Sequence, residues 1–348
     1  MRLLKRACGA SAVLFLCALI LLAIEFGLRR PYTPPIDGNS GQAIASLEQV
    51  SVRGVPEAVL IRGHDRSKPI LLFLHGGPGM PVMFMAHASQ RELEKDFVVV
   101  HWDRRGAGKS YGAFSEQSAS VRSTLDDLYA LVALLRGRFG SQPIYLVGHS
   151  WGTYLGLLAM HERPELFSGY VGMGQMAADK ERIRAARQSF FRQEAEARGD
   201  KEMLARLARG DEIQEDDLFR YGAELRGAES FLPILMLGLR APEYTLADVM
   251  NVPKGSQRLL KHMRYDVAGP TLDRELLAFE KPIYFFLGRH DWNEPSTLAA
   301  AYLQRIRAPA KGVVWFEDSA HFPFLEEPER FRQAMLMVHR RTSRMQAQ

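Results

Sequence analysis

Residues 144–152 read Ile-Tyr-Leu-Val-Gly-His-Ser-Trp-Gly, an apolar run that leads directly into a glycine-flanked turn around Ser150. A short apolar run of this kind, bounded by glycine, indicates a buried strand. A serine on so sharp a strand-to-helix turn has strained backbone angles, and glycine neighbours let the strand and the helix approach closely. The turn lifts the hydroxyl out of the sheet towards a substrate carbonyl. The stretch therefore predicts a nucleophilic serine.

Similar apolar runs alternate with helical patterns along the rest of the chain, which indicates an α/β domain with a mostly parallel central sheet flanked by helices. We expect strands at residues 69–75, 97–102, 143–148, 168–172, 282–288 and 312–316, after an antiparallel hairpin around 50–52 and 58–61. We expect helices at residues 121–138, 153–161, 296–305 and 328–341.

The alternation stops between residues 175 and 280, where Arg, Glu, Leu and Ala recur at helical spacing with almost no strand pattern. Because this stretch is too long for an ordinary connection, we interpret it as a helical cap inserted into the core. The predicted division of the chain is then an N-terminal segment, a linker, a first core part, the cap and a second core part, at residues 1–30, 31–45, 46–174, 175–280 and 281–348.

The N-terminal segment opens with basic residues and continues at 7–24 with 18 uncharged residues, enough to cross a bilayer as a helix. The end of this run offers a poor signal-peptidase site, so the sequence favours an uncleaved transmembrane helix over a cleaved signal and secretion. The basic extreme N-terminus favours a periplasmic or extracellular catalytic domain. The membrane is then a predicted partner of this segment.

Composition excludes several classes of function for the body of the protein. The chain has 348 residues and is 47% hydrophobic, which suffices for a globular core. The net charge is +5, and the basic residues are scattered among acidic ones, so we expect no nucleic-acid partner. Cys8 and Cys17 both lie in the N-terminal segment, which leaves the body without disulfides or a cysteine nucleophile. We expect neither a metal nor a cofactor, and the oligomeric state stays open.

A glycine-rich loop and two later residues complete the predicted site. Residues 75–79 read His-Gly-Gly-Pro-Gly after the strand at 69–75, where the N–H of Gly77 is expected to bind an oxyanion together with the N–H of Trp151. Asp291 follows the strand at 282–288, and His321 follows the strand at 312–316. The order serine, acid, histidine predicts His321 as general base and Asp291 as its partner, with Asp318 as the alternative acid.

Three motifs together resemble the prolyl aminopeptidase (proline iminopeptidase) group of the α/β-hydrolase superfamily. They are His-Gly-Gly-Pro-Gly at 75–79, Asp-Arg-Arg-Gly-Ala-Gly-Lys-Ser at 103–110 and Gly-His-Ser-Trp-Gly at 148–152. The resemblance runs from about residue 50 to the end, apart from the cap, and implies the α/β-hydrolase fold. The group commonly has Gln where Arg104 stands and Gly where His149 stands. The resemblance also implies cap carboxylates that bind a free amine, for which Glu224 and Glu229 are the candidates.

The predicted activity is that of a serine hydrolase that forms an acyl-enzyme. An aminopeptidase that cleaves the N-terminal residue from small peptides competes with a carboxylic-ester or amide hydrolase that has an apolar acyl pocket. Met80 and Phe322, near the predicted site, suit either core packing or such a pocket wall. A minor alternative is a non-catalytic, membrane-tethered binding protein that kept the fold. The intact serine, acid and histidine argue against it.

Overall fold

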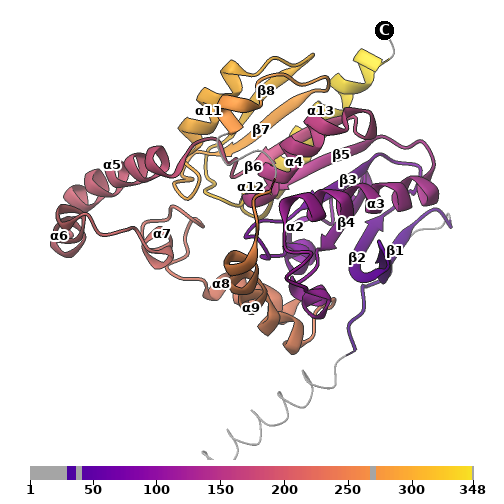
Figure 1. Cartoon of the computed structure of the whole chain (residues 1–348), viewed down its shortest axis with the longest axis horizontal. Helices are drawn as coiled ribbons and strands as arrows, with labels where there is room; N and C mark the ends of the chain where they lie inside the picture. Colours follow the sequence, from indigo (N-terminus) through magenta and orange to yellow (C-terminus); the bar gives the residue numbers. More distant parts are fainter. Residues whose placement is uncertain (1–29, 37–40, 267–271, 347–348) are drawn as a thin grey trace, which may run out of the picture.

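The structure is a computed structural model that describes residues 30–36, 41–266 and 272–346. A sheet of eight strands lies at its centre in the order β1-β2-β4-β3-β5-β6-β7-β8 (Figure 1). The strands are β1 (Ile44–Val52), β2 (Val55–Gly63), β3 (Ile70–Leu74), β4 (Val98–Asp103), β5 (Ile144–His149), β6 (Gly169–Met173), β7 (Ile283–Gly288) and β8 (Lys311–Phe316).

The predicted mostly parallel sheet is confirmed. β1 and β2 form an antiparallel hairpin, and β2 pairs antiparallel with β4, whereas the strands from β4 to β8 in the sheet order are all parallel. Every residue of β3, β4, β5, β6 and β7 is buried. Strands that are buried on both faces have continuous apolar sequences, and their positions could therefore be predicted well from the sequence. The hairpin is longer than predicted because its exposed residues interrupt the apolar pattern.

Helices cover both faces of the sheet. α3 (Val121–Phe139), α4 (Trp151–Glu162) and α11 (Ser296–Arg305) pack on one face, in a core cluster that includes Leu128, Leu155 and Tyr302. α2 (Ala86–Ser89), α12 (Pro323–Glu326) and α13 (Pro328–Gln346) pack on the other, through Phe324 and Met335 among others. Short 3-10 turns complete the connections at η1 (Met83–Met85), η2 (Leu93–Lys95), η3 (Gly108–Ala113) and η4 (Pro164–Leu166).

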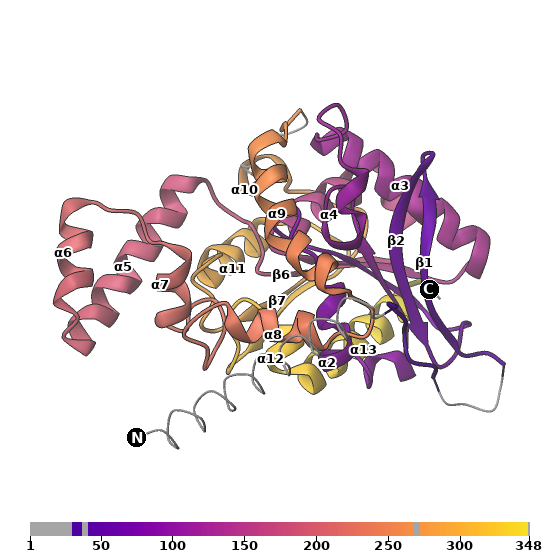
Figure 2. The same ribbon diagram turned by 90° about the horizontal axis from the view of Figure 1, so that it is seen from below.

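A helical insertion separates β6 from β7. It contains α5 (Lys180–Arg198), α6 (Lys201–Arg209), α7 (Glu215–Arg220), α8 (Leu232–Arg240), α9 (Leu246–His262) and α10 (Leu272–Glu275). Both views place α5, α6 and α7 to one side of the sheet (Figures 1 and 2). These three helices share a small apolar cluster around Phe191 and Leu218, while Ile234 of α8 and Val249 of α9 join the core. That the insertion works as a cap stays a prediction.

Local signals explain where the helices of the insertion begin and end. The Asp179 side chain accepts a hydrogen bond from the Arg182 N–H at the start of α5, and Asp200 caps α6 in the same way. Both helices stop at a left-handed glycine, Gly199 and Gly210, which is a common way to end a helix. Local capping residues therefore mark both sides of the turn between α5 and α6.

The prediction of an N-terminal transmembrane helix requires correction. In the described ranges, no helix combines the length and the apolarity needed to cross a bilayer. α3, α5 and α13 have 19 residues each but carry charged side chains, and the strongly apolar α8 has only nine residues. The run 7–24, on which the prediction was based, lies outside the described residues. We therefore withdraw the single-pass anchor, the periplasmic or extracellular placement that depended on it, and the membrane as a partner.

Candidate active site

Ser150 lies between β5 and α4, at the strand-to-helix turn that the sequence predicts. Its backbone has φ 52° and ψ −124°, a conformation that side-chain-bearing residues rarely adopt. The flanking glycines make the turn possible. A Cβ on Gly152 would lie 2.0 Å from the carbonyl oxygen of Leu74, and one on Gly148 would lie 2.9 Å from the carbonyl oxygen of Gly152. Larger residues at these positions would force the strand and the helix apart.

The glycine loop after β3 packs directly against Ser150. A Cβ on Gly76 would lie 2.8 Å from the Cβ of Ser150, so only glycine allows this approach. Gly77 has φ 107°, and a Cβ there would lie 2.6 Å from the backbone nitrogens of Gly79 and Met80. Trp151 begins α4, where the first N–H groups of a helix have no intrahelical partner. The loop and the helix start can therefore present backbone donors beside the Ser150 hydroxyl.

His321 and Asp291 form a buried pair at the same edge of the sheet. His321 follows β8 and Asp291 follows β7; the distance from His321 Nδ1 to Asp291 Oδ2 is 2.9 Å. The second oxygen of Asp291 accepts the Glu294 N–H at 2.9 Å, which fixes the carboxylate plane. Gly174, after β6, leaves room for the imidazole, because a Cβ there would lie 2.4 Å from His321 Cε1. This pair can orient an imidazole as a base.

Three carboxyl groups determine the charge of His321. Burial disfavours the protonated imidazole, but the negative charges of Asp291, Glu224 and Glu294 outweigh it and raise the pKa of His321 to about 9. Burial likewise raises the pKa of Glu224 and of Glu294 to about 7. The positive charge of His321 opposes the shift of Glu224, and those of Arg187, which also lines the cavity described below, and His321 oppose the shift of Glu294. The surroundings of the imidazole therefore favour a positive charge.

A cavity of about 420 Å³ connects these groups. Among the residues that line it are Ser150, Gly77, Trp151, His321 and Glu224. Its acidic wall comes from Glu215, Glu224 and Glu294, and its apolar wall from Met80, Leu218, Leu260 and Phe322. The side-chain oxygen Oε2 of Glu224 is buried without a hydrogen-bond partner in the described structure. The cavity thus has unsatisfied acceptor capacity close to the serine.

Some of the predicted site residues lie at the cavity and others lie away from it. Asp291 is buried in contact with His321, whereas Asp318, the alternative acid, is exposed. Of the two carboxylates suggested by the resemblance, Glu224 lines the cavity; Glu229 is exposed and lies outside the set of described residues that line it. His149 also lines the cavity, and its Nε2–H donates to the His321 carbonyl at 3.0 Å.

Sequence reasoning missed two carboxylates of the acidic wall. Glu294 stands three residues after Asp291 in the turn that follows β7, and that spacing was an available signal. Glu215 begins α7 in the insertion, and no motif of the core predicts its position. Only the folded arrangement brings Glu215 to the cavity.

The titration of His321 leads to a pH prediction. A protonated imidazole cannot accept the serine proton, so activity should be lost below the His321 pKa and present above it. Because that pKa is raised from 6.5 to about 9, the acidic limb of kcat/KM should have its midpoint well above 6.5. Glu224→Gln removes a negative charge and should move the midpoint to lower pH. The measurement is kcat/KM against pH with an uncharged ester substrate.

The control for this titration is Glu196→Gln, on the exposed side of α5, which should leave the midpoint in place. A wild-type midpoint at or below 6.5 would show that the acidic wall does not control the histidine.

The chain is similar in sequence and fold to known proteins. A sequence profile of the alpha/beta hydrolase family matches residues 71–334. The probable aminopeptidase YbaC of Bacillus subtilis (strain 168) is 31% identical over 301 residues, which cover 83% of this chain and 95% of that protein. The proline iminopeptidase of Heyndrickxia coagulans is 23% identical over 271 residues, or 75% of this chain and 87% of that one. The fold also matches the crystal structure of the Mycobacterium smegmatis proline iminopeptidase, with a TM-score of 0.57 and 18% sequence identity. The match covers 85% of this chain and 98% of that chain. The resemblance predicted from the motifs is confirmed.

Proposed function

The chain belongs to the alpha/beta hydrolase family, and we propose that this hydrolase is an aminopeptidase that removes the N-terminal residue from small peptides. The observation that carries the proposal is the wall of three carboxyl groups, Glu215, Glu224 and Glu294, in the same cavity as Ser150. A free α-amine is the part of a peptide that such a wall would bind. The similarity to a probable aminopeptidase agrees with this substrate class. The insertion between β6 and β7 would act as the cap that supplies Glu215 and Glu224.

The proposed mechanism passes through an acyl-enzyme. His321 takes the proton of the Ser150 hydroxyl while the serine oxygen attacks the scissile carbonyl, and Asp291 holds the imidazole in the required tautomer. The N–H groups of Gly77 and Trp151 bind the oxyanion that forms. His321 then gives the proton to the leaving amine, and the C–N bond breaks, which leaves the acyl group as an ester on Ser150. In the second half of the reaction His321 takes a proton from water, the water oxygen attacks the ester carbonyl, and His321 returns the proton to the Ser150 oxygen as the acid is released.

Substrate binding would also prepare the base. A protonated α-amine offers three donors, and the unpartnered Oε2 of Glu224 can accept one of them. The new positive charge would partly neutralise the carboxylates that raise the pKa of His321. The imidazole would then lose its proton more readily when a free-amine substrate is bound. Recognition of the amine and activation of the serine are in this way linked.

This proposal predicts a strong preference for a free amine. A prolyl or other aminoacyl arylamide should be hydrolysed far faster than its N-acetylated form, because acetylation removes the charge that the acidic wall binds. Glu224→Gln should raise KM for the free-amine substrate by roughly 10- to 100-fold, in line with the loss of one charge-assisted hydrogen bond of about 1.5–3 kcal/mol. Glu196→Gln is the matched control. Steady-state kinetics with both arylamides measure the effect.

The competing function, a carboxylic-ester or amide hydrolase, predicts the reverse order. The apolar wall formed by Met80, Leu260 and Phe322 is the observation in its favour. Such an enzyme would prefer short acyl esters, tolerate the N-acetyl group and show no rise in KM in Glu224→Gln. Those results together would replace the aminopeptidase proposal.

A further inference from the structure

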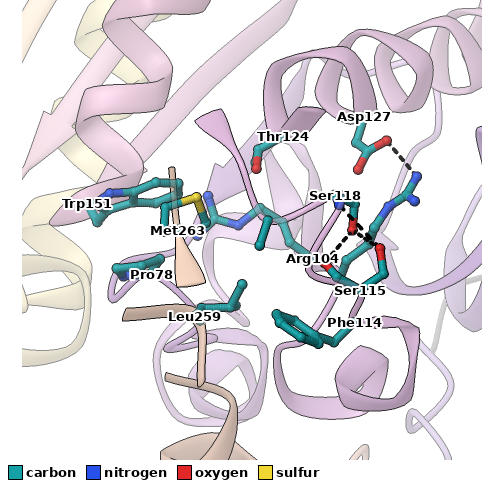
Figure 3. Close-up of a pocket in the computed structure, with 13 residues that line it drawn as sticks. Pro78, Arg104, Phe114, Ser115, Ser118, Thr124, Asp127, Trp151, Leu259 and Met263 are labelled. Carbon is teal, nitrogen blue, oxygen red and sulfur yellow. Dashed lines mark hydrogen bonds and ion pairs between the residues drawn. The ribbon is translucent and has the colours of Figure 1, made fainter. Parts of the chain in front are cut away.

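Arg104 is the buried side chain that contacts both segments of the proposed oxyanion site. It follows β4 and is only 4% exposed. Its Nη2 donates to the carbonyl of His75 at 2.6 Å, and its guanidinium lies over the Trp151 ring at 4.7 Å from the centroid. Figure 3 shows the side chain extending to Trp151 past Met263. One residue therefore connects the loop that carries Gly77 with the start of α4.

The surroundings of Arg104 are unusual for a buried cation. No carboxylate in the described part of the chain forms an ion pair with it, whereas its neighbour Arg105 pairs with Glu57 and Asp127. Its Nη1 is buried without a hydrogen-bond partner. Burial lowers the pKa of Arg104 to about 9, although the charges of Glu57 and Asp103 oppose this shift. Burying an unpaired charge costs stability, so the contacts of Arg104 do not serve stability alone.

The hydrogen bonds of Arg104 fix the tautomer of His75. The Nε2 atom of His75 faces two donors, the Arg104 Nε–H at 3.1 Å and the Arg104 backbone N–H at 3.4 Å. Burial and the positive charge of Arg104 lower the pKa of His75, so its ring is neutral. Nε2 faces donors alone and is therefore the acceptor. Nδ1 faces both the Arg104 Nη2 group and the Gly76 carbonyl, each at 3.0 Å, and carries the ring proton. That Nδ1–H donates to the Gly76 carbonyl at 3.0 Å.

The Gly76 carbonyl belongs to the same peptide group as the Gly77 N–H. Holding the oxygen of a planar peptide fixes the direction of its N–H on the opposite side. The Met80 N–H also donates to this carbonyl, at 3.1 Å. Because Gly76 and Gly77 have no side chains, the loop depends on these outside contacts for its orientation.

We propose that Arg104 is a positioning residue that aligns both oxyanion donors, Gly77 through His75 and the Gly76 carbonyl, and Trp151 through the indole ring. The proposal rests on the proposed function, in which these two N–H groups bind the oxyanion. Such donors must lie within about 2.7–3.1 Å of the oxyanion to stabilise it. A change in the Gly76–Gly77 peptide or a shift of Trp151 would weaken that contact without altering substrate binding in the ground state.

Two substitutions of Arg104 test the proposal. Arg104→Met removes the charge and every side-chain donor while keeping an unbranched chain, and Arg104→Lys keeps the charge but cannot donate to the His75 carbonyl and ring in one plane. Both should lower kcat by about 10- to 100-fold, somewhat less than the roughly 10²- to 10³-fold loss for removing a donor outright. KM should stay within about twofold. The rate of labelling by a fluorophosphonate probe, whose phosphonyl oxygen enters the same site, should fall in parallel.

Arg62→Gln is the matched control, because Arg62 is another buried arginine and bonds Glu94 at 2.8 Å far from the serine. It should lower the melting temperature without lowering kcat per folded molecule. Rates are normalised to the burst of active enzyme, so that loss of folded protein does not imitate the effect. Unchanged kcat in both Arg104 variants, or a rise in KM with constant kcat, would overturn the proposal.

The relay through His75 has its own test. An asparagine amide nitrogen can take the place of Nδ1, and a glutamine amide nitrogen the place of Nε2. His75→Asn should therefore retain more kcat than His75→Gln, and the reverse order would contradict the relay.

If the wild-type enzyme itself were not labelled by the probe, the proposed function would fail. If the wild type were labelled and the variants matched it, only the role of Arg104 would fail.

Discussion

Replacing Ser150 by alanine should lower turnover by at least about 10⁴-fold, because the variant has no hydroxyl to form the acyl-enzyme. The melting temperature should change little, since alanine keeps the Cβ that already packs against Gly76 and loses only one oxygen at the cavity surface. Fluorophosphonate labelling should disappear altogether. Turnover of a chromogenic substrate, burst titration and thermal unfolding measure these three quantities.

Ser230→Ala is a suitable control, because Ser230 is exposed in the insertion and its hydroxyl oxygen accepts the nearby Leu232 N–H. It should behave as the wild type in all three measurements. Near-normal turnover in Ser150→Ala would mean that a different group carries out the reaction.

Asp291→Asn should lower kcat by about 10⁴-fold with little change in KM, because the amide favours the wrong tautomer of His321. One carboxylate oxygen of Asp291 accepts the Glu294 N–H, so the oxygen of an asparagine would remain there. Its NH₂ group would then face His321 Nδ1 and donate to it. The imidazole proton would move to Nε2, and the nitrogen that must accept the serine proton would be occupied. The measurement is kcat and KM with the best chromogenic substrate.

Asp318→Asn provides the comparison, because Asp318 is the exposed alternative acid in the loop before His321. It should leave kcat within about twofold, as exposed substitutions usually do. The opposite result, with Asp318→Asn inactive and Asp291→Asn active, would reassign the acid of the site.

The sequence predicted the core well because its signals are local. β5, the turn at Ser150 and α4 appear in one continuous stretch, and the glycines that the turn needs are adjacent in sequence. Asp291 and His321 follow strands that are recognisable as apolar runs. In a parallel sheet the carboxyl ends of the strands meet at one edge, so residues after three strands are expected to lie together.

The acidic wall was harder to predict because it depends on tertiary packing. Glu224 and Glu229 both lie in the irregular segment between α7 and α8, where no periodicity indicates which side chain faces inward. The structure buries Glu224 and exposes Glu229. The role of Arg104 was equally hidden. A basic residue in a loop is ordinarily read as surface, and only the folded structure brings its guanidinium to Trp151 and His75.

A single hydrogen bond limits how this enzyme can be re-engineered. The backbone N–H of His321 donates to the carbonyl of Glu224 at 3.0 Å, so the insertion directly supports the loop that carries the histidine. An insertion transplanted from another member of the family would change the acidic wall, the support of this loop and the basicity of the imidazole at once. Substrate range and catalytic rate are thus coupled traits in this protein, and selection for a new substrate will also alter its pH optimum.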